Sequence, residues 1–281
     1  METVQSQESQ TQTQSDSYQN PIHPYFSIGG VRINAVTLAQ TIQLMDDWIK
    51  HRHKNYIVLT GAHGVVEMQS DGKLKDINNK AGLVTPDGMS VVWTGRSRGL
   101  KLEKVCASNI MFGTYDVSVE RGYKHFFYGG AEGVADKLVE ELKKMHPGFQ
   151  SVGTYCPPFR PLTAEEKSEV VDMINASGAD IVWVGVGCPK QEAFMNEFRS
   201  LLNVPVMLGV GAGFDFLSGT KPLAPSWVFY SGFEWLFRVF TDPKRMGPRF
   251  ARVVPNFLWL FVKELFGFKK PLNITPEMAQ Q

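Results

Sequence analysis

Short apolar runs alternate with amphipathic segments through the middle of the chain. A strand buried on both faces is apolar at nearly every position, whereas a strand with one solvated face alternates. Six runs are predicted to be strands, and the last two fit the first pattern: 56–60 (YIVLT), 81–86 (AGLVTP), 124–130 (KHFFYGG), 150–155 (QSVGTY), 180–187 (DIVWVGVG) and 204–211 (VPVMLGVG).

Amphipathic segments separate these runs and predict helices. They carry apolar residues three and four positions apart, and they cover 63–80, 88–97, 131–145, 163–177 and 190–202. Thr163 with Glu166 three residues later is a capping-box pattern, which begins a helix. Strands that alternate with helices predict an α/β fold, with a Rossmann-like parallel sheet that has helices on both faces.

The two ends of the chain differ from this middle part. Residues 1–24 are rich in Gln, Ser and Thr and lack the apolar core of a signal peptide, so we expect a disordered N-terminal tail. We divide the rest into a Rossmann-like domain at 25–225, a helical appendage at 226–270 and a flexible C-terminus at 271–281. No window holds 18 consecutive apolar residues, so no spanning helix is expected.

The appendage is distinguished by charge and aromatic content. Residues 227–270 carry a net charge of +5, which leaves −4 for the rest, and hold 13 of the 33 aromatic residues. Aromatic residues mixed with Lys and Arg are typical of a helix that lies on an anionic lipid surface, although a pair of core helices would also fit. We expect two helices broken at Asp242–Pro243 and Gly247–Pro248. The expected contacts are Trp235 and Phe237 with the domain, and Phe257, Trp259 and Phe261 with lipid or a partner subunit.

The whole-chain composition excludes several functional classes. A net charge of +1 does not indicate a nucleic-acid partner, and the three cysteines at 106, 156 and 188 form no disulfide framework, which indicates a reducing compartment. The chain contains no Asp-x-Asp sequence, so we expect no metal cofactor, with arginines and helix N-termini in place of Mg²⁺.

Candidate catalytic residues follow the predicted strands, where the ligands of open α/β sheets bind. Asp87 lies between a strand and a helix and is either a helix cap or a base that faces a cleft. The stretch VGVGCPKQEAF places Lys190, Gln191 and Glu192 in the first turn of a helix. The glycines at these strand ends can present N–H groups to a diphosphate, and they are Gly129, Gly130, Gly187 and Gly211.

Four motifs in this order resemble the WecG/TagA/CpsF glycosyltransferases, family 26: TPDGMSVVW, GVGCPKQEAF, GVGAGFDFLSG and FEWLFRVFTDPKR. The similarity runs from about Ile28 to Arg252. The resemblance implies a Rossmann-like domain whose C-terminal appendage contacts the membrane and completes the active site. It implies transfer of a sugar from a UDP-sugar to a polyprenyl-diphosphate-linked saccharide, with inversion, in the biosynthesis of a cell-surface polysaccharide. The enzyme would be cytoplasmic and attached peripherally to the inner leaflet of the cytoplasmic membrane.

The resemblance also implies roles for individual residues. Asp87 matches the proposed catalytic base, and Gln191 and Thr60 match polar residues of the active site. Asp215 lies where the donor pocket would be, while Arg238 and Arg245 would face the diphosphate, as Lys190 can. The chain departs from the family pattern at Ala62, where members commonly carry Asn and where His63 follows, and at Asn109, where they carry an acid. These departures leave the donor sugar open, and the sequence also leaves a homo-oligomer open.

Two other functions compete with this interpretation. A nucleotide-cofactor oxidoreductase could use the same sheet, but the glycines at 129–133 are spaced G-G-x-x-G, no ribose-binding acid follows, and no Tyr-x-x-x-Lys pair occurs. A non-catalytic, membrane-associated binding module would not need Asp87.

Overall fold

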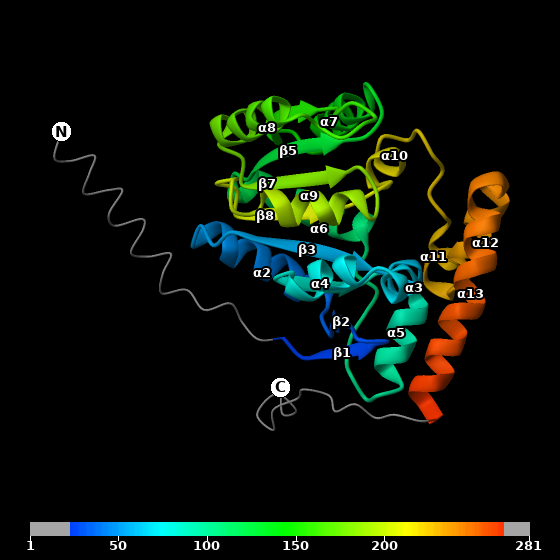
Figure 1. Ribbon diagram of the computed structural model, residues 1–281. Coiled ribbons are helices and arrows are strands. Elements are labelled where there is room, and N and C mark those ends of the chain that lie inside the picture. The colour runs from blue at the N-terminus through cyan, green and yellow to red at the C-terminus, as the bar shows by residue number, and fades with distance from the viewer. Residues whose placement is uncertain (1–22, 267–281) are drawn as a thin grey trace, which may run out of the picture.

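Two sheets form the framework of the protein. The computed structural model describes residues 23–266, with side chains up to Glu264. A short antiparallel hairpin precedes a six-stranded parallel sheet of order β4-β3-β8-β7-β5-β6 (Figure 1). The strands are β1 (Tyr25–Ile28), β2 (Val31–Asn34), β3 (Asn55–Thr60), β4 (Leu83–Pro86), β5 (Lys124–Gly129), β6 (Gln150–Tyr155), β7 (Ile181–Gly185) and β8 (Val206–Gly209).

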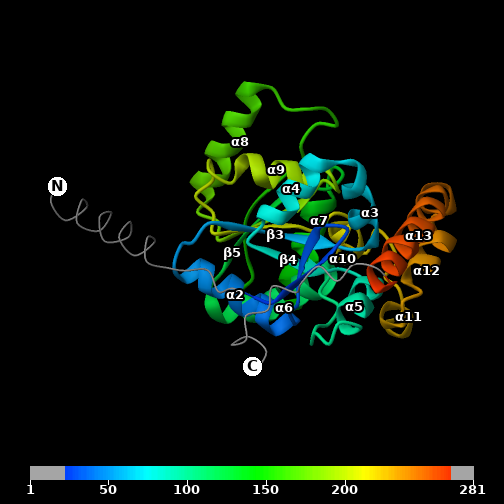
Figure 2. The same ribbon diagram turned by 60° about the horizontal axis from the view of Figure 1, so that its bottom comes forward.

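Helices cover both faces of the parallel sheet (Figure 2). One face packs against α3 (Ala62–Ser70), α4 (Gly72–Lys80), α8 (Ala164–Ser177) and α9 (Lys190–Phe198). The other packs against α2 (Leu38–Lys50), α6 (Ala107–Arg121), α7 (Val134–Met145) and α10 (Gly213–Leu217). Central strands such as β7 and β8 are buried almost throughout, as their apolar sequences require. The predicted fold class is confirmed.

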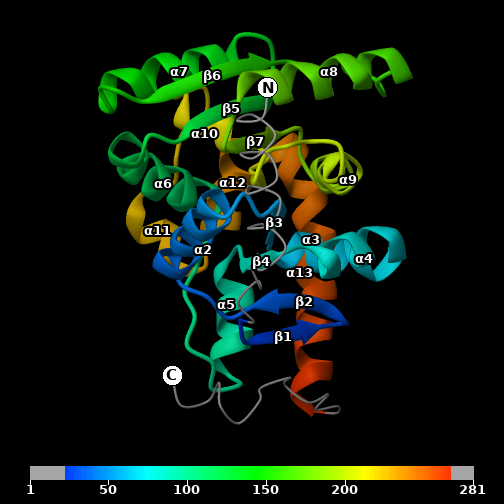
Figure 3. The ribbon, with the colours of Figure 1, turned by 90° about the vertical axis from the view of Figure 1, so that its left-hand side faces the viewer.

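The carboxyl ends of the parallel strands point toward the C-terminal helices (Figure 1). These helices are α11 (Ser226–Ser231), α12 (Glu234–Thr241) and α13 (Pro243–Phe266), while α5 (Met89–Arg96) follows β4. Viewed along the sheet, α13 passes behind the strands and reaches the β1–β2 hairpin (Figure 3). The appendage therefore covers the edge of the sheet at which ligands of such folds bind.

The appendage differs in two ways from the sequence-based expectation. The break at Asp242–Pro243 is present, but Gly247–Pro248 does not break the chain, because α13 continues through Pro248 and Pro255. A proline inside a helix costs about 3 kcal/mol. Burial of Val253, Phe257 and Leu260 in the core can offset that cost, since each large apolar side chain contributes about 1.5–3 kcal/mol.

The second difference concerns the aromatic residues of α13. Phe257 is 7% exposed and belongs to the core, so its expected contact with lipid is wrong, whereas Trp259 is 61% exposed. Trp235 packs against Phe250 of the same appendage, with ring centroids 5.8 Å apart. One helix thus has both a core face and an apolar outer face.

The division of the chain into four parts stays a prediction. The start of α11 at Ser226 follows the position where the composition changes. The tails at 1–22 and 267–281 lie outside the described residues. Within 23–266, no helix has both the length and the mean hydropathy needed to cross a membrane.

Candidate active site

Asp87 lies directly after β4 and is fixed by the backbone of the neighbouring strand. Its N–H donates to the carbonyl oxygen of Thr60 at 3.1 Å, which ties the ends of β3 and β4 together. A Cβ atom at Gly61 would lie 2.3 Å from the Asp87 carbonyl oxygen, so only glycine permits this approach. The local sequence therefore brings a carboxyl group to the carboxyl edge of the sheet.

Burial and nearby charges act on the Asp87 carboxyl in opposite directions. Desolvation by burial raises its pKa, Lys104 and Arg238 lower it through their positive charge, and Glu234 raises it. Burial is the largest of these effects, so the carboxylate is a stronger base than an exposed aspartate. A base of this kind can accept a proton from a substrate hydroxyl.

Lys104 connects Asp87 to the appendage. Its side chain is 2% exposed, and Nζ donates to Glu234 Oε2 at 2.5 Å and to the carbonyl oxygen of Phe229 at 3.0 Å. Nζ also lies 3.2 Å from the centroid of the Phe229 ring. Arg238 Nε donates to the other oxygen of Glu234 at 2.9 Å. Lys104 was not singled out in the sequence, because nothing in its polar loop marks it as buried.

Gln191 joins the glycine turns after β7 and β8. Its side chain is buried, Oε1 accepts from the N–H of Gly211 at 2.9 Å, and Nε2 donates to Glu192 Oε1 at 3.1 Å. Gly187 and Gly211 have φ values of 81° and 51°, which favour glycine. Glu192 is also buried, which raises the pKa of its carboxyl. In this arrangement, Gln191 holds the two turns at a fixed separation.

Thr60 and Asn109 have hydrogen-bond partners within the fold. The Thr60 hydroxyl is buried and donates to Asn78 Oδ1 at 2.7 Å. Asn109 Oδ1 accepts from the N–H of Cys106 at 2.7 Å, and Nδ2 donates to the Lys104 carbonyl at 2.8 Å. Asn109 therefore fixes the start of α6 and the backbone that carries Lys104.

The glycines after β5 permit close packing of the backbone. Gly129 has a φ of 112°, and a Cβ atom there would lie 2.7 Å from the Gly185 carbonyl carbon. The N–H of Gly130 donates to the Gly185 carbonyl at 3.0 Å, so this N–H is engaged within the protein. The contacts of both glycines with Gly185 of β7 therefore explain their presence without a bound ligand.

Of the predicted site residues, Asp87 and Arg238 belong to one cluster of charges, whereas Lys190 and Asp215 have other partners. Asp87 and Arg238 interact through Lys104 and Glu234. Lys190 is exposed and its Nζ lies 4.7 Å from the centroid of the exposed Phe159 ring. Asp215 forms an ion pair with Lys221.

The sequence of this chain matches the Glycosyl transferase WecG/TagA/CpsF family over residues 26–271. The chain belongs to this family. Curated relatives include an N-acetylglucosaminyldiphosphoundecaprenol N-acetyl-beta-D-mannosaminyltransferase of Bacillus spizizenii, 28% identical over 77% of this chain and 82% of the relative. A protein of the same name from Bacillus subtilis is 25% identical over 67% of this chain and 72% of its own length.

Membership of this family makes the protein a glycosyltransferase, so the oxidoreductase and the non-catalytic module are set aside. Family membership also agrees with a site at the carboxyl edge of the sheet. Two basic residues of the appendage lie at this edge without a carboxylate partner within the described part of the chain. Arg245 is exposed, and Arg249 is half-buried close to it.

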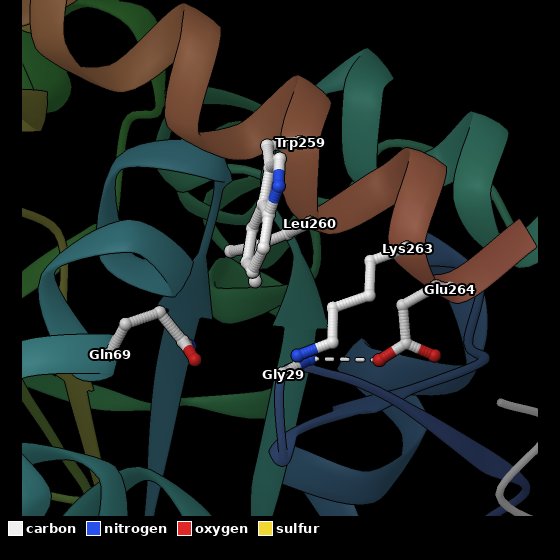
Figure 4. A pocket seen from close by; sticks show the side chains of 6 residues that line it. All are labelled: Gly29, Gln69, Trp259, Leu260, Lys263 and Glu264. Carbon is white, nitrogen blue, oxygen red and sulfur yellow. Dashed lines mark hydrogen bonds between the residues drawn. The ribbon is translucent and has the colours of Figure 1, made fainter. Parts of the chain in front are cut away.

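A pocket of about 330 Å³ in this glycosyltransferase lies elsewhere. It opens between the β1–β2 turn, α3 and the C-terminal part of α13 (Figure 4). It is lined by Gly29, Gln69, Trp259, Leu260, Lys263 and Glu264. None of these residues belongs to the predicted active site.

Within residues 23–266, no three His, Cys, Asp or Glu side chains gather as a metal site would require. Metal independence of the reaction stays a prediction.

Proposed function

We propose that this glycosyltransferase moves a sugar from a UDP-sugar to a saccharide linked to polyprenyl diphosphate, with inversion at the anomeric carbon. The observation that carries the proposal is the Asp87 carboxyl, half-buried at the junction of β4 with the basic appendage, where desolvation raises its pKa. The names of the relatives describe transfer to N-acetylglucosaminyl-diphosphoundecaprenol, which supports an acceptor of this class. The product would enter a cell-surface polysaccharide.

The reaction is a single displacement in which each group has a defined role. Asp87 takes the proton from the acceptor hydroxyl while that oxygen attacks the anomeric carbon of the donor. The bond from the anomeric carbon to the diphosphate oxygen breaks, and UDP leaves with the electron pair. Attack opposite the leaving group inverts the anomeric centre. Burial, which raises the pKa of Asp87, strengthens it as the base.

The leaving diphosphate needs positive charge as the bond breaks. Arg245 and Lys190 are exposed cations on the appendage and on the turn after β7, and Arg238 lies beside Glu234 near Asp87. Arginine binds phosphate oxygens with two parallel hydrogen bonds, so these side chains can take the place of a divalent cation. Turnover is therefore expected to persist in EDTA. Turnover that disappears in EDTA and returns with Mg²⁺ or Mn²⁺ would contradict this expectation.

The appendage also supports action at the inner face of the cytoplasmic membrane. Its outer surface exposes large apolar side chains, among them Trp227, Phe233, Phe240 and Trp259, next to its basic residues. Such a surface can insert aromatic rings between lipid headgroups while cations attract anionic lipid. An acceptor anchored in the same leaflet would then reach Asp87 without leaving the membrane.

The test is a product analysis with defined substrates. The full chain is mixed with a synthetic polyprenyl-diphosphate N-acetylglucosamine and with single UDP-sugars, and the products are identified by mass and anomeric configuration. UDP-N-acetylmannosamine is the first donor to test, because both relatives are named for that sugar. One β-linked product supports the proposal. Hydrolysis alone, or retention of configuration, would overturn it.

A further inference from the structure

Arg249 on α13 differs from the other arginines that face the domain. Arg252 pairs with Glu67 and Arg238 with Glu234, while Arg98 of the domain pairs with Glu264 of α13. No carboxylate of the described residues lies within ion-pair distance of Arg249. Burial lowers the pKa of Arg249, and the like charges of Arg245 and Arg238 lower it further, while Cys188 and Glu67 oppose this shift. Glu67 is already paired with Arg252. A half-buried cation without a counterion is unfavourable unless an anion joins it.

Among the residues that the structure describes, Arg249 makes one side-chain hydrogen bond, and its acceptor is neutral. Its Nη2 lies 2.8 Å from Nδ1 of His63, in the first turn of α3. A guanidinium can only donate, so Nδ1 must accept and the ring proton sits on Nε2. Burial, together with the charge of Arg249, lowers the pKa of His63 to about 4, with Glu67 opposing and Arg252 adding to the effect. The imidazole therefore orients the guanidinium without neutralising it.

The His63–Arg249 pair places the positive charge of Arg249 near the carboxyl ends of the parallel strands. His63 follows β3 directly, and Arg249 lies close enough to Cys188, in the turn after β7, for its charge to act on that thiol. The end of β8 lies between these two strands. Arg249 is also within electrostatic reach of Arg238, which acts on Asp87. The cation thus faces the same region as the proposed base.

We propose that His63 is a positioning residue that holds Arg249, uncompensated, for the diphosphate of a substrate. The inference rests on the proposed function, because it assigns the anion to a sugar or lipid diphosphate. A carboxylate at position 63 would orient Arg249 equally well but would cancel its charge, as Glu67 does for Arg252. A neutral acceptor gives orientation and leaves the charge for the ligand.

The experiment compares four variants of the full chain: His63→Ala, Arg249→Ala, the double variant and His63→Gln, whose amide oxygen can still accept. Calorimetry measures UDP affinity, and steady-state kinetics measures the KM for the lipid-diphosphate acceptor, so the two arms show which diphosphate is bound. Arg252→Ala is the matched control, because Arg252 lies on the same helix and also contacts α3, but already has a carboxylate partner.

His63→Ala is expected to weaken the binding of either UDP or the lipid-diphosphate acceptor about 10-fold. This is the scale of a lost charge-assisted hydrogen bond. The substitution should have no further effect when Arg249 is already Ala, and His63→Gln should restore most of the affinity. Unchanged affinity for both ligands in His63→Ala, or additive losses in the double variant, would overturn the inference. If His63→Ala does not fold, Arg249→Ala and His63→Gln are compared instead. Loss of affinity in Arg249→Ala with retention in His63→Gln supports the inference, whereas unchanged affinity in Arg249→Ala or loss in His63→Gln would overturn it. UDP binding is measured without turnover, so failure of the proposed transfer reaction is seen separately.

Discussion

At Asp87, the same burial that strengthens the base makes its charged form unfavourable. An acid whose pKa is raised in the folded state binds its proton more tightly there than in the unfolded chain. It therefore reduces stability as the pH rises through the interval between its unfolded and folded pKa values.

Asp87→Asn is expected to lower turnover by roughly 10²–10⁴-fold, the scale of general-base loss. It should leave the melting temperature at pH 7 equal or higher, because a neutral amide replaces a desolvated carboxylate. Product formation and thermal unfolding are measured on the same preparation. Near-normal turnover in the folded variant would refute the assignment of Asp87 as the base.

A second residue-scale prediction concerns Gln191. Replacing it with Ala leaves the Gly211 N–H and Glu192 Oε1 without their partner, so unfolding free energy should fall by about 1–3 kcal/mol along with turnover. Lys190→Ala, one residue away and exposed, should lower turnover without changing the melting temperature. A stable Gln191→Ala protein with reduced turnover would mean instead that the side chain acts on substrate.

The sequence alone located some of these residues and missed others for a physical reason. Asp87 directly follows β4, and Gln191 lies in the first turn of α9, the helix that follows β7; the apolar runs of these strands reveal both places. Lys104 and Arg249 lie in a loop and in a helix, and their roles depend on contacts with residues more than a hundred positions away. Such contacts leave no local pattern in a single sequence.

Among the elements, the contact between the loop that carries Lys104 and α12 holds the appendage on the domain. Glu234→Ala would leave the buried Lys104 without its carboxylate, and breaking such a pair costs on the order of 3 kcal/mol. We expect a lower melting temperature and lower turnover, measured by thermal unfolding and by the glycosyltransfer assay. Glu141→Ala is the control, because its pair with Lys144 is solvent-exposed and should not affect either quantity. Equal behaviour of the two variants would show that Glu234 does not hold the appendage.

Elements were predictable where a simple periodic pattern was present. The six predicted strands are present, although β6 at the edge of the sheet is only partly buried, and α8 begins with its predicted capping box of Thr163 and Glu166. The hairpin β1–β2 and the helices α2 and α6 received no prediction. The buried face of α6 includes Thr114 and Ser118 beside its apolar residues, so its periodicity is weak. The helix break predicted at Gly247–Pro248 is wrong, because tertiary packing keeps α13 continuous.

At the scale of the whole molecule, the appendage is part of the core as well as a cover for the site. Val253, Phe257 and Leu260 pack into the same cluster as residues of the sheet and α3. The composition changes at Pro225, but helix α13 beyond that position packs into the same core as the sheet. The composition of these helices reflects their exposed aromatic and basic residues. The packing of their buried residues can be seen only in the three-dimensional structure.

Because the inner face of the appendage stabilises the fold, its role at the membrane must be tested on the outer face. Replacing the exposed Trp227, Phe240 and Trp259 together with Ser removes apolar surface that touches little of the core, so the protein should stay folded. We expect this variant to stop sedimenting with vesicles that contain phosphatidylglycerol, because aromatic insertion and charge act together in such binding. Turnover of a membrane-anchored acceptor should fall with it, whereas turnover of a short-chain soluble acceptor should not. Met145→Ser, on the distant helix α7 and 50% exposed, is the control for loss of apolar surface. Vesicle binding that survives the triple substitution would mean that the exposed aromatic residues serve another contact.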